Sequence, residues 1–174
     1  MFPIRDHNKT GKFPIVSVIF IILNIIFFLV ELIQPDLEFF LTKFALIPGK
    51  VDWFMPVTLL PFLTSMFLHG GWLHLISNML FLWIFCDNIE ATLGSVNFAI
   101  FYLLTGFAAA LAQYFIDPGS LIPILGASGA IAGVLGSYLV LFPHSRIETL
   151  ITGFGGYFRM VNIPAGFMLV YWLV

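Results

Sequence analysis

The fold is decided first by residues 13–30, which read FPIVSVIFIILNIIFFLV and carry no charged side chain. Four more stretches are free of charge as well: residues 53–86, 91–116, 118–145 and 160–174. Over the whole chain 60% of the residues are hydrophobic and 9% are charged, against about a quarter charged in an ordinary soluble domain. So few charged side chains cannot cover the surface of a water-soluble domain. We therefore expect an integral, multi-pass membrane protein in a lipid bilayer.

Apolar runs predict the membrane helices, since a spanning helix needs about 20 apolar residues. The proline-rich residues 35–70 are too interrupted for one straight span and are expected at the membrane surface, partly embedded. Loops are expected at Asp117–Pro123 and around Gly153–Gly156. The expected helices are Pro14–Gln34, Trp72–Ile89, Ser95–Ile116, Ala127–Phe142 and one that begins near Val161. The fold class is therefore an all-α membrane protein, with a tail at residues 1–13 and a transmembrane domain at residues 14–174.

The lysine and arginine distribution predicts the orientation, because cytoplasmic segments of membrane proteins carry an excess of both. The connections on one side of the membrane hold Lys43 and Lys50. The N-terminal tail and the connections on its side hold Arg5, Lys9, Lys12, Arg146 and Arg159. This bias places the N-terminus in the cytoplasm. It also puts the first turns of the second and fourth expected helices together on the outer side.

Charge and cysteine content exclude several classes of function. A formal net charge of -2 gives no basic surface for nucleic acid. Cys86 is the one cysteine, so the chain has no internal disulfide and no CxxC metal or redox motif. The sequence has no internal repeat, and its acidic residues lie at the ends of the apolar segments. Both features argue against a transporter or channel, which is one alternative for such a chain.

A candidate nucleophile lies at the start of the fourth expected helix, in the sequence Gly126-Ala-Ser128-Gly129. Small residues recur every four positions along this helix, a pattern that by itself indicates close helix packing. Ser128 also falls in the first turn, where free backbone N–H groups and the helix dipole favour negative charge. A serine in this position is suited to attack a carbonyl while nearby amides receive the oxyanion. The motif alone leaves packing and catalysis both open.

Two polar side chains share one face of the second expected helix. His74 and Asn78 are four residues apart, so they lie on the same side of the helix. Polar groups inside a membrane segment are costly, and they usually serve either catalysis or a contact with a neighbouring helix. His69 lies just before this helix, and for it we expect a structural role at the membrane interface.

Together these segments resemble the rhomboid family of intramembrane serine proteases. The stretch His69-Gly-Gly-Trp-Leu-His74-Leu-Ile-Ser-Asn78 is similar to the family's H-x4-H-x3-N helix, and Gly126-Ala-Ser128-Gly129 is similar to its G-x-S-G motif. Glu90-Ala-Thr-Leu-Gly94 also fits the family pattern. The resemblance implies a six-helix transmembrane bundle, of which about five helices are present. It implies cleavage of transmembrane or membrane-adjacent protein substrates without a metal or a cofactor.

The same resemblance assigns roles to individual residues. Ser128 is the nucleophile, and His74 and Asn78 form the oxyanion hole with the backbone N–H of Ser128. Gly126 allows the backbone to approach this site closely. The family's general-base histidine lies on a sixth helix, which this sequence does not contain. His144 follows the far end of the Ser128 helix, so it does not replace that base.

The end of the chain adds two expectations. A helix from Val161 covers about 21 Å at the α-helical rise when it reaches Val174, which is too short to span. The sequence is therefore expected to be a fragment, and the 174-residue chain is expected to be inactive by itself. The alternative to a protease is a rhomboid-like pseudoprotease or membrane chaperone that binds transmembrane clients. The presence of Ser128, His74 and Asn78 together argues against that alternative.

Overall fold

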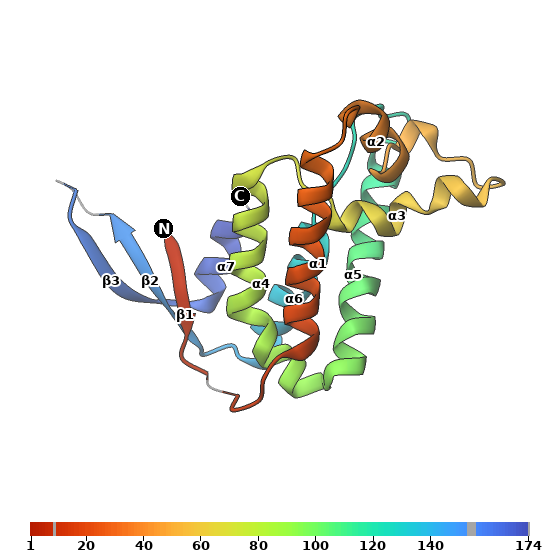
Figure 1. Ribbon diagram of the computed structural model, residues 1–174. Coiled ribbons are helices and arrows are strands. Elements are labelled where there is room, and N and C mark those ends of the chain that lie inside the picture. Colours follow the sequence, from red (N-terminus) through yellow and green to blue (C-terminus); the bar gives the residue numbers. More distant parts are fainter. Residues whose placement is uncertain (9, 153–155, 174) are drawn as a thin grey trace.

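The computed structural model describes residues 1–8, 10–152 and 156–173, and it is mostly helical (Figure 1). The helices that are long and apolar enough to cross a membrane are α1 (Ile15–Leu32), α4 (Trp72–Leu93) and α5 (Ser95–Ile116). Their mean hydropathies are 2.9, 1.2 and 1.7. These helices confirm the multi-pass membrane protein expected from the sequence, and each begins within a residue of its expected start.

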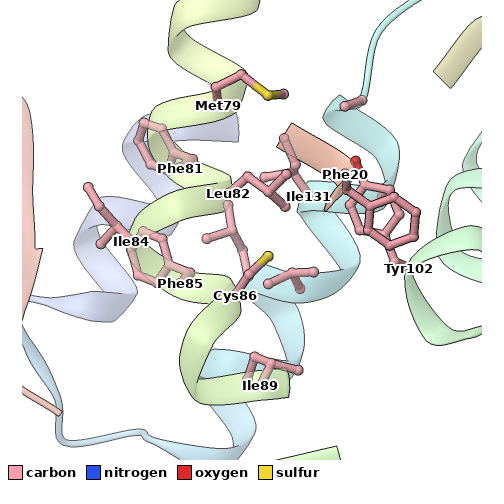
Figure 2. Packing of buried hydrophobic residues seen from close by; sticks show 14 of the residues in the cluster. Phe20, Met79, Phe81, Leu82, Ile84, Phe85, Cys86, Ile89, Tyr102 and Ile131 are labelled. Atoms are coloured by element: carbon pink, nitrogen blue, oxygen red, sulfur yellow. The ribbon is translucent and has the colours of Figure 1, made fainter. Parts of the chain in front are cut away.

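Helix α4 is the central helix of the bundle. In its most apolar stretch 56% of the residues are buried, against 28% in α1 and 22% in α5. In Figure 2, Leu82 and Cys86 point toward Ile131, with Phe20 and Tyr102 beyond it, whereas the labelled Phe81, Ile84 and Phe85 point to the other side of α4. The stacked rings of Phe20 and Tyr102 are 4.3 Å apart. The α4 side chains with no exposed surface are Leu82, Phe85, Cys86 and Ile89. Because lipid tails are as apolar as these side chains, close packing and polar contacts hold such helices together.

Helix α6 (Ser128–Leu141) packs closely against α5. A Cβ atom added to Gly129 or Gly133 would lie 2.4 Å or 2.5 Å from a side-chain atom of α5, so a larger residue would push the two helices apart. By contrast, a Cβ on Gly136 would meet no described atom within 4 Å. The small residues at one face of α6 therefore serve packing, as the four-residue repeat predicted. Ser128 lies on another face and is exposed.

Glu90, near the end of α4, holds the first turn of α1. Its carboxylate accepts hydrogen bonds from the backbone N–H groups of Val16 at 3.0 Å and Ser17 at 2.9 Å. The hydroxyls of Ser17 and Ser95 donate to the same carboxylate at 2.8 Å and 2.6 Å. A carboxylate stabilises this end of α1 because the first N–H groups of a helix lack intrahelical partners and the helix dipole is positive there. Glu90 thus joins α4 to the starts of α1 and α5.

The segment between α1 and α4 folds into short helices instead of a span. Asp36 caps α2 (Leu37–Phe44) by accepting a hydrogen bond from the Phe39 N–H at 2.9 Å. An antiparallel bridge between Leu46 and Ile124 ties the segment to the loop that precedes α6. This bridge helps to fix where α6 begins. The remaining short elements are the 3-10 turns Pro48–Lys50, Pro56–Leu59 and Ser65–Phe67 and the one-turn helix α3 (Pro61–Thr64).

The chain is not all-α, which corrects one expectation. An antiparallel sheet with the strand order β1-β2-β3 lies to one side of α4 and α7 (Figure 1). Its strands are β1 (Phe2–Asp6), β2 (Arg146–Thr152) and β3 (Phe158–Pro164). The helix expected from Val161 was placed too early, because β3 continues through Pro164 and α7 spans Ala165–Leu173. The loop expected around Gly153–Gly156 falls largely outside the described residues, which omit 153–155.

Alternation of side chains explains the sheet. In β2, Ile147 and Thr149 have no exposed surface, and side chains two apart point to the same face of a strand. An ion pair between Arg5 and Glu148 adds to the pairing of β1 with β2. The alternation and the β-branched residues of β2 are typical of a strand with one buried face. Val161, where a helix was expected to begin, lies in β3, which pairs with β2 along its whole length.

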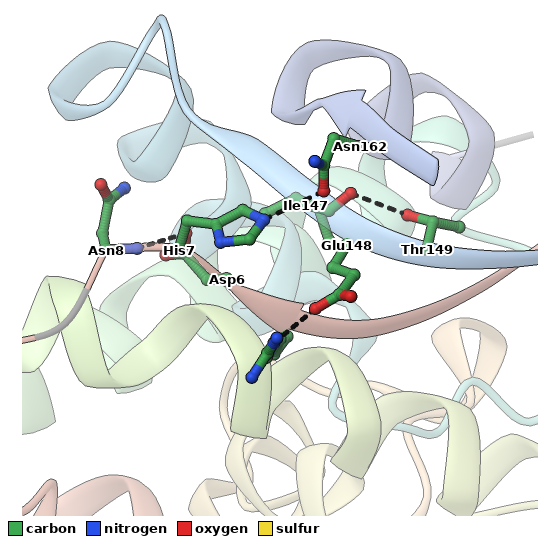
Figure 3. A network of polar contacts seen from close by, with 8 residues as sticks. Asp6, His7, Asn8, Ile147, Glu148, Thr149 and Asn162 are labelled. Carbon is green, nitrogen blue, oxygen red and sulfur yellow. Dashed lines mark hydrogen bonds and ion pairs between the residues drawn. The ribbon is translucent and has the colours of Figure 1, made fainter. Parts of the chain in front are cut away.

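A polar network binds the N-terminal strand to the helices. The Asp6 carboxylate accepts hydrogen bonds from the Tyr138 hydroxyl of α6 at 2.5 Å and from Asn88 Nδ2 of α4 at 2.7 Å. In Figure 3, the ring of His7 reaches Asn162 of β3, with 3.0 Å between Nε2 and Oδ1. Asp6, the last residue of β1, is therefore bonded to α4 and α6, and the next residue, His7, is bonded to β3.

Candidate active site

Ser128 is the first residue of α6, and its position suits a nucleophile. The residue before it, Ala127, has no side chain that caps the helix, so the first turn keeps free N–H donors beside the serine. The side chain of Ser128 is exposed. It lines a cavity of about 110 Å³ together with Ser65, Gln113 and Gly126.

Gly126 brings the backbone next to the polar face of α4. Its φ is 119°, a conformation that favours glycine, and its N–H donates to the Ser65 carbonyl at 2.9 Å. A Cβ on Gly126 would lie 2.7 Å from Nε2 of His74 and 3.7 Å from Nδ2 of Asn78. Any side chain here would displace His74, so glycine is required for this close approach.

The structure thus brings together three of the four site residues predicted from the sequence. His74, Asn78 and Gly126 are in mutual proximity, and Ser128 follows two residues after Gly126. Within the described contacts, no hydrogen bond joins the Ser128 hydroxyl to either polar side chain of α4. Gly126 lines the cavity beside Ser128, which neither polar side chain of α4 lines, and it also lies next to His74 and Asn78. Polar donors near a serine hydroxyl are the parts needed to bind an oxyanion next to a nucleophile.

His69 has a larger role than its position in the sequence indicated. It is 1% exposed, so its side chain is buried within the protein. Asn78 donates from Nδ2 to Nε2 of His69 at 3.0 Å, and the rings of His69 and His74 are edge to face with 5.0 Å between centroids. The backbone N–H of His69 donates to Oε2 of Glu31 at 3.1 Å. Glu31 was therefore missed, although a carboxylate close to the end of a membrane helix is itself a signal.

The electrostatics of the site keep His69 neutral. His69 lies in the loop before α4, and burial, followed by the neighbouring His74, lowers its pKa to about 4, against an opposing contribution from the Phe67 backbone. A neutral ring has one nitrogen that accepts a hydrogen bond. Nε2 is that nitrogen here, because Asn78 donates to it. The neutral His69 ring is therefore the acceptor for the Asn78 amide.

The other two histidines lie away from this site. His7 and His144 line a shallow groove beside the sheet, together with Arg146, beyond the opposite end of α6. No group of three or more His, Cys, Asp or Glu side chains is arranged to hold a metal ion among the residues with described positions.

Comparisons with known proteins give the family. Residues 56–174 match the family model described as the rhomboid domain. The chain is 39% identical to Rhomboid protein 1, mitochondrial, of Saccharomyces cerevisiae over 87 residues, which are 48% of this chain and 25% of that protein. It is 34% identical to the Putative rhomboid protease YdcA of Bacillus subtilis over 87 residues, which are 49% of this chain and 43% of that protein.

A third relative differs in kind. The chain is 35% identical over 86 residues to Inactive rhomboid protein 1 of Drosophila melanogaster, covering 49% of this chain and 6% of that protein. In each of these three relatives, the matched part is less than half of the protein's length. The match of the family model over most of the chain, with His74, Asn78 and Gly126 assembled beside Ser128, leads to one conclusion: the chain belongs to the rhomboid family.

Proposed function

We propose that this protein is an intramembrane serine endopeptidase that cleaves transmembrane or membrane-adjacent protein substrates. The observation that carries the proposal is the position of His74 and Asn78, which lie 2.7 Å and 3.7 Å from the point that a Cβ on Gly126 would occupy, two residues before Ser128. Polar donors buried between membrane helices are costly unless they bind something. A substrate oxyanion next to an exposed serine hydroxyl is the ligand that suits them best.

The proposed reaction follows from these groups. The Ser128 oxygen attacks the carbonyl carbon of the scissile peptide, and the hydroxyl proton goes to a general base. The negative oxygen of the tetrahedral intermediate receives hydrogen bonds from His74, from Asn78 and from the backbone N–H of Ser128. The general base then gives this proton to the leaving nitrogen, so that cleavage of the C–N bond releases the amine and leaves an acyl group on Ser128. Water then attacks this ester and frees the serine.

The general base is assigned by family resemblance to a histidine on the sixth helix of a rhomboid bundle, with the helices described here as the other part of that bundle. His7 and His144 lie at the sheet, His69 accepts a hydrogen bond from Asn78, and His74 is assigned to the oxyanion hole. A serine hydroxyl without a base is a poor nucleophile at neutral pH. We therefore expect residues 1–174 alone to cleave substrate far more slowly than a protein that includes such a helix.

A non-catalytic rhomboid-like protein that binds transmembrane clients is the second candidate. One matched relative is named an inactive rhomboid, and the Ser128 hydroxyl has no hydrogen-bond partner among the described residues. The two candidates differ in what Ser128 does. If Ser128 is a nucleophile, its replacement abolishes cleavage. If the protein only binds clients, replacement of this exposed serine leaves client binding unchanged.

The test is cleavage of a model transmembrane substrate in reconstituted membranes by the intact protein, including any residues that flank those described. Ser128→Ala is compared with Ser137→Ala. Ser137 is a partly buried serine nine residues further along α6. We expect cleavage to be lost in Ser128→Ala and kept in Ser137→Ala. Unchanged cleavage in Ser128→Ala rejects the protease. Client binding without cleavage in the wild type supports the non-catalytic alternative.

A further inference from the structure

Glu31 is a buried carboxylate that the reaction above does not use. It lies in the last turns of α1 and is 5% exposed. Within the described part of the chain, no lysine or arginine forms an ion pair with it; the ion pair found there joins Arg5 and Glu148 at the sheet. A buried carboxylate without a cation is costly in a membrane protein. A specific contact of the carboxylate must therefore offset this cost.

That contact is with the backbone of the loop that leads into α4. Oε2 of Glu31 accepts a hydrogen bond from the N–H of His69 at 3.1 Å. This loop turns at Gly70 and Gly71 before α4 begins, and glycine leaves such a turn mobile unless other contacts hold it. The carboxylate of α1 thus fixes the backbone from which the His69 side chain projects.

The His69 side chain connects this fixed backbone to the candidate active site. Its Nε2 accepts a hydrogen bond from Nδ2 of Asn78 at 3.0 Å. One of the two N–H bonds on that nitrogen is used in this way, which sets the plane of the amide and leaves the second N–H for another acceptor. The same Nδ2 lies 3.7 Å from the space at Gly126 that a Cβ would fill. Two hydrogen bonds therefore connect Glu31 through His69 to the Asn78 amide next to Gly126.

We propose that Glu31 is a positioning residue for catalysis, which orients the oxyanion donor Asn78 through His69. This inference rests on the proposed protease function. Glu31 touches neither substrate nor nucleophile, and its action depends on accepting a hydrogen bond, not on its charge. Glutamine keeps an acceptor of the same length at this position, whereas methionine keeps the shape and has no comparable acceptor.

The expected effects follow from the geometry. Misplacement of a catalytic donor by about 1 Å can reduce the rate about 100-fold. We expect Glu31→Met to lower kcat about 10- to 100-fold with little change in KM, because an oxyanion donor acts mainly in the transition state. Glu31→Gln is expected to stay within about threefold of wild type, since its carbonyl oxygen replaces Oε2 as the acceptor. Glu38→Met, at an exposed acidic position on α2, is the matched control.

The decisive comparison is made in the absence of Asn78. If Glu31 acts through this donor, Glu31→Met has no further effect on kcat in an Asn78→Ala background, because residues that act as a unit are not additive. A general structural role predicts the same loss in both backgrounds. If Glu31→Met does not fold, Glu31→Asp takes its place, since its shorter side chain withdraws the acceptor from the His69 N–H.

The outcomes separate the two levels of the proposal. Cleavage that persists in Ser128→Ala rejects the protease function, whatever Glu31 does. If Ser128→Ala and Asn78→Ala both lose activity, the inference about Glu31 fails on either of two results. One is that Glu31→Met, or its substitute Glu31→Asp, changes kcat by less than about twofold. The other is that it costs as much in the Asn78→Ala background as in the wild type.

Discussion

Replacing Gly126 by alanine perturbs the candidate site at its closest contact. The new Cβ lies 2.7 Å from Cε1 and Nε2 of His74, whereas ordinary van der Waals contact begins at 3.4 Å, so the ring must retreat by about 0.7 Å. Alanine at a positive φ also adds backbone strain of about 1–2 kcal/mol. A donor displaced by such a distance loses most of its transition-state hydrogen bond. We expect kcat to fall about 10- to 100-fold and Tm to fall as well.

The control for this change is Gly136→Ala in the same helix. Its added Cβ meets no described atom within 4 Å, and alanine favours a helix interior over glycine by about 0.5–1 kcal/mol. We expect kcat to be unchanged and Tm to stay the same or rise. Both variants are compared with wild type by cleavage of a model transmembrane substrate and by thermal unfolding in detergent. Full activity in a folded Gly126→Ala protein refutes the role assigned to this contact.

Three further results are expected. His74→Ala and Asn78→Ala are each expected to reduce kcat about 10²–10³-fold with a smaller effect on substrate binding; an unchanged kcat in both leaves them a packing role. If the N-terminus is in the cytoplasm, an impermeant thiol reagent labels Lys43→Cys but not Arg146→Cys in intact cells, both in a cysteine-free background. The reverse labelling pattern shows the opposite orientation. The pKa of His69 is lowered from 6.5 to about 4, so the folded state favours the neutral ring. The free energy of unfolding is therefore highest above about pH 6.5 and falls by about 3 kcal/mol as the pH drops toward 4. Measured as Tm against pH, this loss is expected to shrink in His69→Gln, and an identical profile in both proteins excludes His69 as its source.

The membrane helices could be predicted because long apolar stretches without charged side chains indicate them directly. Residues 95–116 contain no charged side chain, and they form α5 with the expected bounds. The proximity of His74 and Gly126 was expected only through the resemblance to the rhomboid family, because the motifs around these two residues do not by themselves show that the two segments meet.

The parts that were missed depend on contacts between distant residues. The sheet pairs Arg5 with Glu148, which are 143 residues apart, and nothing near Arg5 indicates a strand partner. Glu31 reads from the sequence as an acid at a helix end, and its burial follows from the return of the chain 38 residues later at His69. In Arg146–Thr152, alternation was present in the sequence and was overlooked because the surrounding composition favours membrane helices.

The central claim, that Ser128 is an activated nucleophile, is tested most directly by covalent labelling. The intact protein is treated in membranes with a serine-reactive fluorophosphonate, and the modified residue is located by mass spectrometry of proteolytic peptides. We expect one adduct, on Ser128, that is absent in Ser128→Ala and is formed at wild-type rate in Ser137→Ala. An intact protein that cleaves its substrate while Ser128 stays unmodified, or while another residue carries the adduct, contradicts the account.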